Sequence, residues 1–403
     1  MAIQSGVGSS KKSNNAFEAG MSAAHMALER MGAANPDLTV VFSSVIFDQP
    51  ELLQGIQTVV GKSPLVGCST AGEITSEGFD RRSIVVMTLK SKELQCGVGL
   101  GEGITKDALQ VGRDVAKNAI RRNPADRFAF MMMPDGLKGN GANVIKGIQE
   151  VLGNSFPIIG GSAGDDFLFE NTYQYYNGRV FNDAVVGTLF GGDVAIGIGA
   201  RHGWQPLGKL RKITKARENI IEEIDGVRAV EIYTEYFGKK IEELSKEGPL
   251  ARITIMYPLG MTVVGEEEYL LRNILRVTSS GALVCAGEIP QGAEARLMMA
   301  SDSLAIAAAK NAAERALDNM GDVEVNVAFV FNSASRARLL GRRGKQEIEA
   351  IKQVFGKDVS IIGFCTYGEQ APLRAEMNVG RSYFHNETIA ILAIGEKKKD
   401  KQD

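Results

Sequence analysis

The chain has 403 residues, of which 44% are hydrophobic and 23% charged, a globular composition whose length favours two domains over one. Its formal net charge of −2 argues against a nucleic acid or an anionic membrane as partner, because such partners attract an excess of Lys and Arg. The sequence shows neither an apolar leader nor a run of the roughly 20 apolar residues that span a bilayer, so we expect a cytoplasmic protein.

The first predicted elements follow a small, polar stretch, residues 1–15, which is expected to be disordered. The apolar segment 38–44 is typical of a buried strand. Residues 55–73, GIQTVVGKSPLVGCSTAGE, give the end of an amphipathic helix, a Gly at its C-terminal stop, a short strand, and a loop rich in Gly and hydroxyl side chains. Glu73 closes this loop, and residues 83–90 then have β character.

This pattern occurs three times, which indicates an internal repeat. Its second copy is GIQEVLGNSFPIIGGSAGDD (147–166), and its third copy is AIKQVFGKDVSIIGFCTYGE (350–369). Both copies have flanking elements, namely apolar strands at 127–133 and 325–331, β segments at 183–190 and 387–395, and long preceding helices at 105–122 and 302–320. An Asn-Gly pair at 177–178 predicts a hairpin after the second copy.

A strand, a helix and a second strand at this spacing predict βαβ crossovers, in which the two strands are parallel. The expected fold class is therefore α/β, with two domains whose mixed, mainly parallel sheets carry helices on their faces. We place the domains at 16–230 and 231–396, with the boundary in the charged helical stretch 225–248. Residues 397–403 form a charged tail.

Two kinds of residue in these loops raise the question of catalysis. GGSAG (160–164) matches the nucleophile-elbow motif around Ser162, but the residues after it predict a hairpin where an elbow needs a helix. Cys68 and Cys365 fall at nearly equivalent loop positions, yet a thiol nucleophile needs a positive neighbour or a His. Small, half-buried thiols beside a pocket are the simpler interpretation. We predict no catalytic residue, and cysteine-dependent chemistry stays as an alternative.

Cofactor and metal motifs are incomplete as well. The glycine runs 98–105 and 195–203 do not complete G-x-G-x-x-G, and they indicate close packing of strands. The four cysteines are widely spaced and the three histidines are scattered, so the pattern predicts reduced thiols and no metal site.

If the three loops lie at one edge of parallel strands, their polar side chains should line a ligand crevice. Glycines would let the backbone approach a ligand, hydroxyls would donate and accept, carboxylates would pair a ligand amine, and Arg336 would clamp a ligand carboxylate. Such a pocket suits an amino acid or a similar zwitterion. The alternative is that the carboxylates accept backbone N–H groups and hold the turns. The candidate ligand-binding residues from the loops and Arg336 are Ser69, Thr70, Glu73, Gly160, Gly161, Ser162, Asp165, Arg336, Thr366, Tyr367 and Glu369.

At these residues the chain resembles the FIST family, which pairs FIST N-terminal and C-terminal domains in signal-transduction and some F-box proteins. The segments that carry the resemblance are VGCSTAGEI (66–74), PIIGGSAGDDF (157–167), HGWQPLGKLRKITKA (202–216), IIGFCTYGEQAP (361–372) and FHNET (384–388). The last segment adds His385 and Asn386 to the candidate ligand-binding residues. Two positions depart from the family pattern, with Ser333 where many members have Cys and Gln370 where they have an aliphatic residue.

The resemblance implies a sensory module that binds a small ligand, for which amino acids are suggested, and that is not an enzyme. Because the paired domains take up nearly the whole sequence, we expect the signal to pass to a partner such as a histidine kinase. No cofactor is predicted. The alternative is a haem-binding nitric oxide sensor that regulates a histidine kinase, for which the available histidines are His25, His202 and His385.

Overall fold

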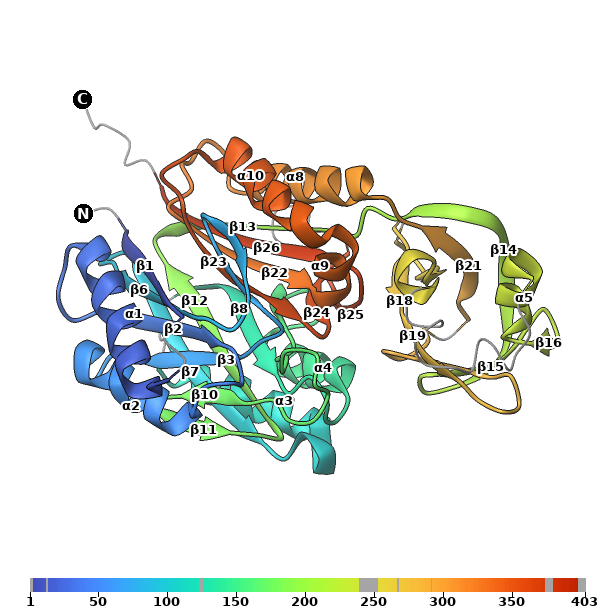
Figure 1. Ribbon diagram of the computed structural model, residues 1–403, viewed down its shortest axis with the longest axis horizontal. Coiled ribbons are helices and arrows are strands. Elements are labelled where there is room, and N and C mark those ends of the chain that lie inside the picture. The colour runs from blue at the N-terminus through green and yellow to red at the C-terminus, as the bar shows by residue number, and fades with distance from the viewer. Residues whose placement is uncertain are drawn as a thin grey trace.

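The computed structural model describes residues 3–11, 14–122, 126–238, 253–266, 268–290, 292–373 and 380–397. It consists of a large body and a smaller lobe at the right of Figure 1, which is formed by the segment between residues 205 and 299. The body contains three units of similar order. The charged tail predicted at 397–403 lies, apart from residue 397, outside the described residues.

The three units share one sequence of elements. The first unit comprises β1 (Gln4–Ser10), α1 (Ala16–Met31), β2 (Leu38–Ser43), α2 (Gln49–Val60), β3 (Leu65–Ser69), β4 (Glu73–Thr75), β5 (Gly78–Asp80) and β6 (Ile84–Lys90). The second comprises β7 (Leu94–Glu102), α3 (Ile104–Ile120), β8 (Arg127–Pro134), α4 (Gly141–Leu152), β9 (Ile158–Gly161), β10 (Gln174–Tyr176), β11 (Arg179–Phe181) and β12 (Ala184–Gly192).

The third unit is interrupted by the lobe. It comprises β13 (Val194–Arg201), α8 (Asp302–Asp318), β22 (Val327–Ser333), α9 (Ala334–Leu340), a 3-10 turn (Gly341–Gly344), α10 (Lys345–Phe355), β23 (Ser360–Thr366), β24 (Glu369–Pro372), β25 (Ser382–His385) and β26 (Ile389–Glu396). The helix predicted at 302–320 is confirmed, and the Ser301 hydroxyl caps it by accepting from the Leu304 N–H.

Each of the three body sheets takes its last two strands from a different unit. The sheet orders are β1-β6-β2-β3-β10-β11, β7-β12-β8-β9-β24-β25 and β13-β26-β22-β23-β4-β5. The hairpin that follows β3 therefore joins the third sheet, the hairpin that follows β9 joins the first, and the hairpin that follows β23 joins the second. This cyclic exchange links the units into a ring.

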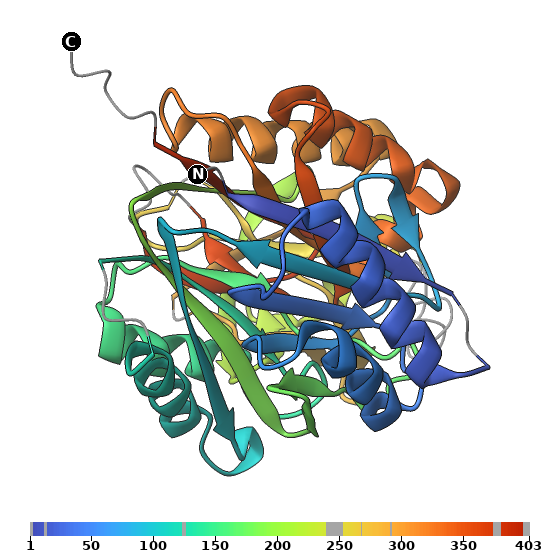
Figure 2. The same ribbon diagram turned by 90° about the vertical axis from the view of Figure 1, so that its left-hand side faces the viewer.

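The sheets face one another around a shared apolar core, and the helices lie outside them (Figure 2). The core contains Phe42, Phe331 and Phe364, with 4.6 Å between the ring centroids of Phe42 and Phe364. Separate apolar layers join each sheet to its helix pair, namely α1 with α2, α3 with α4, and α8 with α10. The α/β class with helices on the sheet faces is confirmed.

Glycines permit the closest contacts between these layers. A Cβ on Gly197 or Gly199 would lie 1.8 or 1.9 Å from a backbone oxygen of α8, so this glycine run permits close packing of strand β13 on a helix and not on another strand. In the strands that lead into the three polar loops, a Cβ on Gly67, Gly160 or Gly363 would lie 1.9 Å from a carbonyl oxygen of the parallel neighbouring strand. The repeat in the sequence thus reflects one steric requirement met three times.

Two predictions for the body were wrong. Residues 4–10 are the strand β1, which is paired to β6, because neighbouring strands impose an extended conformation on a segment of low intrinsic propensity. The sheets are mixed but not mainly parallel. Each contains a single parallel pair, β2–β3, β8–β9 or β22–β23, and the other described pairs are antiparallel because hairpins and returning strands complete each sheet.

The lobe has its own sheet and apolar core. Its elements are β14 (Gln205–Arg217), β15 (Ile220–Ile224), β16 (Val227–Arg228), α5 (Glu231–Phe237), β17 (Leu259–Met261), β18 (Leu270–Arg272), β19 (Ile274–Val277), β20 (Leu283–Cys285) and β21 (Glu294–Met299). The lobe leaves and re-enters the body through paired strands, since Gln205 of β14 lies opposite Met299 of β21. The predicted domain boundary between residues 230 and 231 falls inside this lobe.

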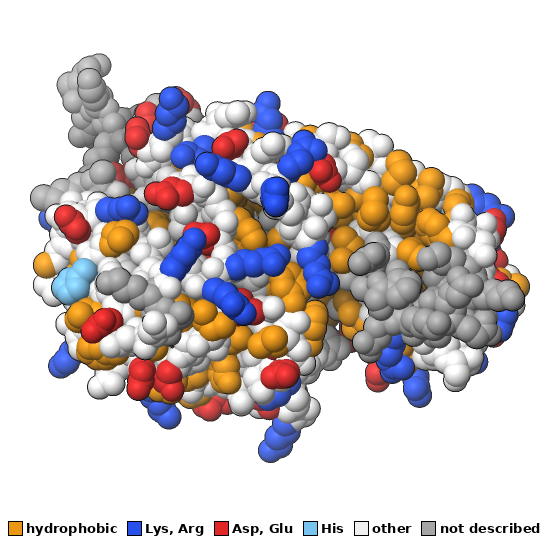
Figure 3. Space-filling model, in the orientation of Figure 1, with side chains coloured by type: hydrophobic (Ala, Val, Ile, Leu, Met, Phe, Trp, Pro, Cys, Tyr) orange, Lys and Arg blue, Asp and Glu red, His pale blue; other side chains and the backbone are white. Residues whose placement is uncertain are grey.

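The surface matches the small net charge. On the face shown in Figure 3, basic and acidic side chains are interspersed over the body. Within the described ranges, no helix combines the length and hydropathy needed to cross a bilayer.

Candidate functional site

The three polar loops meet inside the body and bond to one another in a ring. Ala71 N–H donates to the Cys365 carbonyl at 3.0 Å, Tyr367 N–H donates to the Ser162 carbonyl at 3.1 Å, and Gly164 N–H donates to the Ser69 carbonyl at 3.0 Å. The expectation that these loops gather in one place is correct. At their centre, the loops form a buried junction that is held together by these backbone hydrogen bonds.

The polar side chains at this junction bond mainly to each other. The Thr70 and Thr366 hydroxyls donate to the carboxyl groups of Glu73 and Glu369 at equivalent positions. Glu73 also accepts from the Ser83 N–H at 3.1 Å, and Glu369 from the Thr388 N–H at 3.0 Å. Burial raises the pKa of both carboxyl groups to about 8, although these hydrogen bonds oppose the shift.

Asp165 likewise holds its own turn. Its carboxylate accepts from the N–H groups of Phe169 and Asn171, both at 3.0 Å, and from the Tyr367 hydroxyl at 2.6 Å. The Ser69 hydroxyl donates to the Gly164 carbonyl at 2.7 Å. For these side chains, the structure agrees with the alternative in which loop carboxylates and hydroxyls stabilise turns.

Arg336 lies in the core of the third unit, with none of its surface exposed. Its guanidinium forms an ion pair with Glu347 and donates to Asn332 Oδ1 at 3.0 Å, to the His202 carbonyl at 2.5 Å and to the Ala305 carbonyl at 2.7 Å. Because these bonds use its donors within the protein, Arg336 does not clamp a ligand carboxylate. The prediction failed because sequence spacing does not show which way a side chain near a strand end points.

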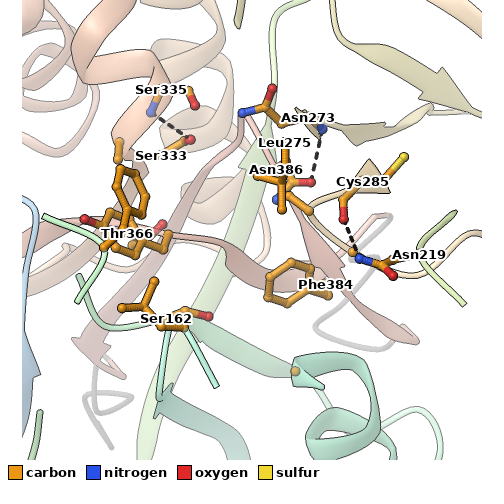
Figure 4. A pocket seen from close by; sticks show the side chains of 18 of the residues that line it. Ser162, Asn219, Asn273, Leu275, Cys285, Ser333, Ser335, Thr366, Phe384 and Asn386 are labelled. Atoms are coloured by element: carbon orange, nitrogen blue, oxygen red, sulfur yellow. Dashed lines mark hydrogen bonds between the residues drawn. The ribbon is translucent and has the colours of Figure 1, made fainter. Parts of the chain in front are cut away.

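A cavity of about 940 Å³ opens beside the junction, between body and lobe (Figure 4). Four candidate residues line it: Ser162, Thr366, Tyr367 and Asn386. Outside its lining lie Ser69, Thr70, Glu73, Gly160, Gly161, Asp165, Arg336, Glu369 and His385. The Thr366 and Tyr367 hydroxyls are engaged by Glu369 and Asp165, so these two residues contribute shape more than free polar groups.

Most of the cavity wall comes from residues that the sequence did not single out. The lobe supplies Asn219, Asn273 and Cys285, and the loop between β8 and α4, together with the start of α4, supplies residues 135–142. The lobe approaches the body through polar contacts, since Asn273 N–H donates to Asn386 Oδ1 at 3.3 Å and Arg272 donates to the Phe384 carbonyl at 3.0 Å. One available signal was the apolar run 167–169, FLF, directly after a polar loop.

None of the histidines is placed to ligate a haem iron in this cavity. Both ring nitrogens of His385 have partners, Ala371 O at 2.9 Å and Thr388 Oγ1 at 3.5 Å, and His202 Nδ1 accepts from the Trp204 N–H at 2.9 Å. His25 is exposed on α1, and no histidine belongs to the cavity lining within the described residues. The donor set therefore does not fit haem. The same described ranges contain no cluster of His, Cys, Asp and Glu that could hold a metal ion.

The thiols are not set up as nucleophiles. Burial raises the pKa of Cys68 and Cys365 well above the usual range, and it raises the pKa of Cys285 to about 12. A thiolate would therefore be rare at neutral pH, the opposite of what an attacking cysteine needs.

Comparison with protein-family models shows the family to which the chain belongs. The FIST N domain matches residues 37–227, and the FIST C domain matches residues 229–372. The chain belongs to the FIST family. FIST domains are associated with signal transduction and small-ligand sensing, and the two matches meet inside the lobe, at the β15–β16 hairpin.

Relatives of this FIST protein add little about function. An uncharacterized protein of Methanocaldococcus jannaschii, MJ1623, is 26% identical over 235 residues, which cover 56% of this chain and 45% of that protein. Among solved structures, a cyanuric acid hydrolase from A. caulinodans is 9% identical and covers 98% of this chain and 100% of its own, with a TM-score of 0.36. A chorismatase is also 9% identical, with 98% and 99% coverage and a TM-score of 0.36. Likeness at this level carries no information about activity.

Proposed function

We propose that this FIST protein is a small-ligand sensor of signal transduction that binds its ligand in the cavity between body and lobe. The observation that carries this proposal is the apolar rim. Leu168, Phe169 and Leu275 line the cavity with 57%, 61% and 57% of their surface exposed, and Leu137, which also belongs to the lining, is 36% exposed. Large apolar side chains gathered at one hollow, with polar groups among them, are typical of a binding site.

The lining suits an amino acid or a similar small metabolite. Lys138 and Arg338 bring positive charge to the cavity, and Glu218 and Glu288 bring negative charge. Asn219, Asn273 and Asn386 add amide groups. A ligand with an apolar side chain and both charged groups would match all three features.

The arrangement of the cavity supports ligand binding without catalysis. The hydroxyls of Thr366 and Tyr367 in the cavity lining are held by internal hydrogen bonds, and the Cys285 thiol of the lining is buried, which raises its pKa to about 12. A bound ligand would bridge two parts of the chain that are joined by the paired strands β14 and β21. We propose that ligand binding shifts the lobe relative to the body and that a partner such as a histidine kinase detects this change.

Thermal unfolding of the purified protein in the presence of amino acids and small metabolites tests the proposal. A ligand at a hundredfold excess over its Kd stabilises the native state by about 2.7 kcal/mol, which is readily measured. At least one compound should raise the Tm, and the rise should be lost in a variant with a charge at the apolar rim. A library without any stabilising compound would count against the function.

A further inference from the structure

The loop after β9 holds three residues in a left-handed backbone conformation. Asp166, Phe167 and Phe169 have φ of 56°, 67° and 58°, a region that is unusual for any side chain with a Cβ and an outlier for a bulky one. Such strain costs free energy, persists only where the surrounding structure enforces it, and is found most often at functional sites. Gly at these positions would avoid the cost, so the loop retains its aromatic side chains at the expense of stability.

Buried hydrogen bonds enforce this conformation. The Asp165 carboxylate accepts from the Phe169 N–H at 3.0 Å and from the Glu170 N–H at 2.6 Å. The Tyr367 hydroxyl accepts from the Phe167 N–H at 2.8 Å and donates to Asp165 at 2.6 Å. The loop backbone is thus fixed before any ligand arrives, and little conformational entropy is left to lose when a ligand binds to it.

The loop presents an aromatic surface to the cavity. Phe169 stacks on Tyr367, with 5.0 Å between the ring centroids and 16° between the ring planes. Phe167 meets the Phe169 ring edge-on, at a centroid distance of 6.5 Å and an angle of 72°. All three rings belong to the cavity lining, and Phe169 is 61% exposed, so the ring face that Tyr367 does not cover is open. A planar ring of a ligand can extend this stack.

A cation lies beside these rings. The Arg338 guanidinium lies over the Phe167 ring, 4.7 Å from the ring centroid, and Arg338 is exposed and lines the cavity. Arg338 takes part in none of the ion pairs between described residues. Its charge is therefore available to an anion, and a carboxylate matches the forked donors of a guanidinium.

The acidic side chains of the lining leave this positive charge in place. The Asp135 carboxylate accepts from the Thr172 hydroxyl at 2.8 Å, and the Glu288 carboxylate accepts from the Asn140 side chain. Glu218 is exposed, but it belongs to the lobe, whereas the three rings and the guanidinium belong to the body. The body side of the cavity thus combines an open aromatic face with a free cation.

We propose that the cavity takes a ligand with an aromatic ring and a carboxylate, in which the ring stacks on Phe169 and the carboxylate pairs with Arg338. Phe167 is a neighbour of both anchors, so a short chain between ring and carboxylate suits the site. This inference rests on the proposed function and narrows it. The cavity selects for an aromatic ring and not only for apolar bulk.

Isothermal titration calorimetry with matched acids tests the ring. 3-Phenylpropanoate and 3-cyclohexylpropanoate have the same charge and chain length, and the cyclohexyl ring is the more apolar of the two. Apolar burial alone would favour the cyclohexyl acid, whereas stacking should make the phenyl acid bind at least threefold more tightly. L-Phenylalanine should exceed 3-cyclohexyl-L-alanine by the same factor. Equal or tighter binding of the cyclohexyl compounds overturns the inference.

A neutral compound tests the charge. 3-Phenylpropanamide, which lacks the carboxylate, should bind at least tenfold more weakly than 3-phenylpropanoate. Arg338→Gln should remove this difference, because it weakens the acid and leaves the amide within twofold. Arg342→Gln, at an exposed position outside the cavity lining, is the matched control and should preserve the difference. An acid and an amide of equal affinity for the unaltered protein would contradict the role of Arg338.

Substitutions of Phe169 test why the loop is strained. Phe169→Gly relieves the left-handed strain and removes the ring, so it should leave the Tm unchanged or raise it while weakening 3-phenylpropanoate at least tenfold. Phe169→Tyr keeps a ring and should bind this acid within threefold of the unaltered protein. Tyr236→Leu removes an exposed ring outside the lining and should not change the affinity. A Phe169→Gly protein with a lower Tm and unchanged affinity would show that the ring serves the fold.

The outcomes also separate this inference from the proposed function. If an aliphatic metabolite stabilises the protein and none of the aromatic acids binds, the aromatic specificity is wrong and the sensor function stands. If no compound of the wider library binds, the sensor function itself fails. If Phe169→Gly does not fold, the two pairs of ring compounds and Arg338→Gln still decide the question.

Discussion

Arg336 and Glu347 form an ion pair in which both side chains are buried, one at 0% and the other at 1% exposure. The same guanidinium donates to the His202 carbonyl, where the chain leaves for the lobe, and to the Ala305 carbonyl in α8, where it has returned. The pair therefore ties α9 and α10 to both connections of the lobe. A residue expected to hold a ligand holds the base of the lobe.

Arg336→Met should lower the free energy of unfolding by about 3–5 kcal/mol, because it leaves the Glu347 carboxylate buried without its partner. The double variant Arg336→Met/Glu347→Leu should recover part of this loss, since both buried charges are then gone. Urea unfolding measures both, with Arg342→Met at an exposed position as control. A double variant no more stable than Arg336→Met would contradict the explanation.

Gly67→Ala, Gly160→Ala and Gly363→Ala should each destabilise the protein by about 3 kcal/mol or more, because the new Cβ would overlap a carbonyl oxygen of the neighbouring strand. Gly344→Ala is the matched control, since its φ is −54° and a Cβ there meets no atom within 4 Å. It should be neutral or slightly stabilising. Expression level and Tm report both results, and tolerance of all three strand substitutions would argue against the steric account.

The contribution of Glu73 and Glu369 to the free energy of unfolding should fall as the pH rises from about 4.5 to 8. Their native pKa of about 8 exceeds the ordinary value of 4.5, so the native state binds more protons than the unfolded state in this window. Each group contributes a slope of at most about 1.4 kcal/mol per pH unit. Glu73→Gln and Glu369→Gln should flatten the dependence in urea titrations between pH 5 and 8, whereas Glu349→Gln should leave it unchanged.

Leu275→Asp should weaken binding of the most stabilising compound about tenfold or more, because it replaces apolar contact area in the cavity by a charge. Its effect on Tm without ligand should be small, since this side chain is 57% exposed. Val264→Asp, also in the lobe but outside the cavity and 92% exposed, is the control. Equal binding by both variants would place the ligand elsewhere.

All four cysteines should react slowly with iodoacetamide at pH 7.5, because burial raises the thiol pKa of each one. Labelling should become fast only when urea unfolds the protein, and mass spectrometry can follow each site. One thiol that reacts rapidly in the native protein would favour the cysteine-dependent alternative.

The sequence revealed those parts of the fold that local patterns determine. The hairpin turn at Asn177–Gly178, the helix that begins at residue 302 and the repeated loops are correct because turn, helix-start and glycine chemistry act over a few residues. The lobe was missed because its strands pair over long distances, as Gln205 does with Met299. No local signal in the sequence indicates that pairing.

In the candidate site, too, the sequence revealed the residues marked by local patterns and missed those placed by the tertiary structure. Ser162, Thr366, Tyr367 and Asn386 were found because the repeated loops and the family resemblance marked them. Asn273 and Leu275 come from the lobe, and Arg336 turned inward to Glu347, a residue on a different helix. The tertiary structure decides whether a side chain faces the cavity or the core, and the repeat pattern does not contain that information.

The exchange of hairpins among the three units also affects the order of folding. The edge of the first hairpin, at Ile74 and Thr75, pairs with Gly363 and Ile362 of β23, so more than two thirds of the chain separates the two partners. During synthesis this edge must wait for the last unit to emerge, and the ring then closes in one late step. A fragment that ends within the lobe would keep two units and leave that strand edge open to pairing with other molecules.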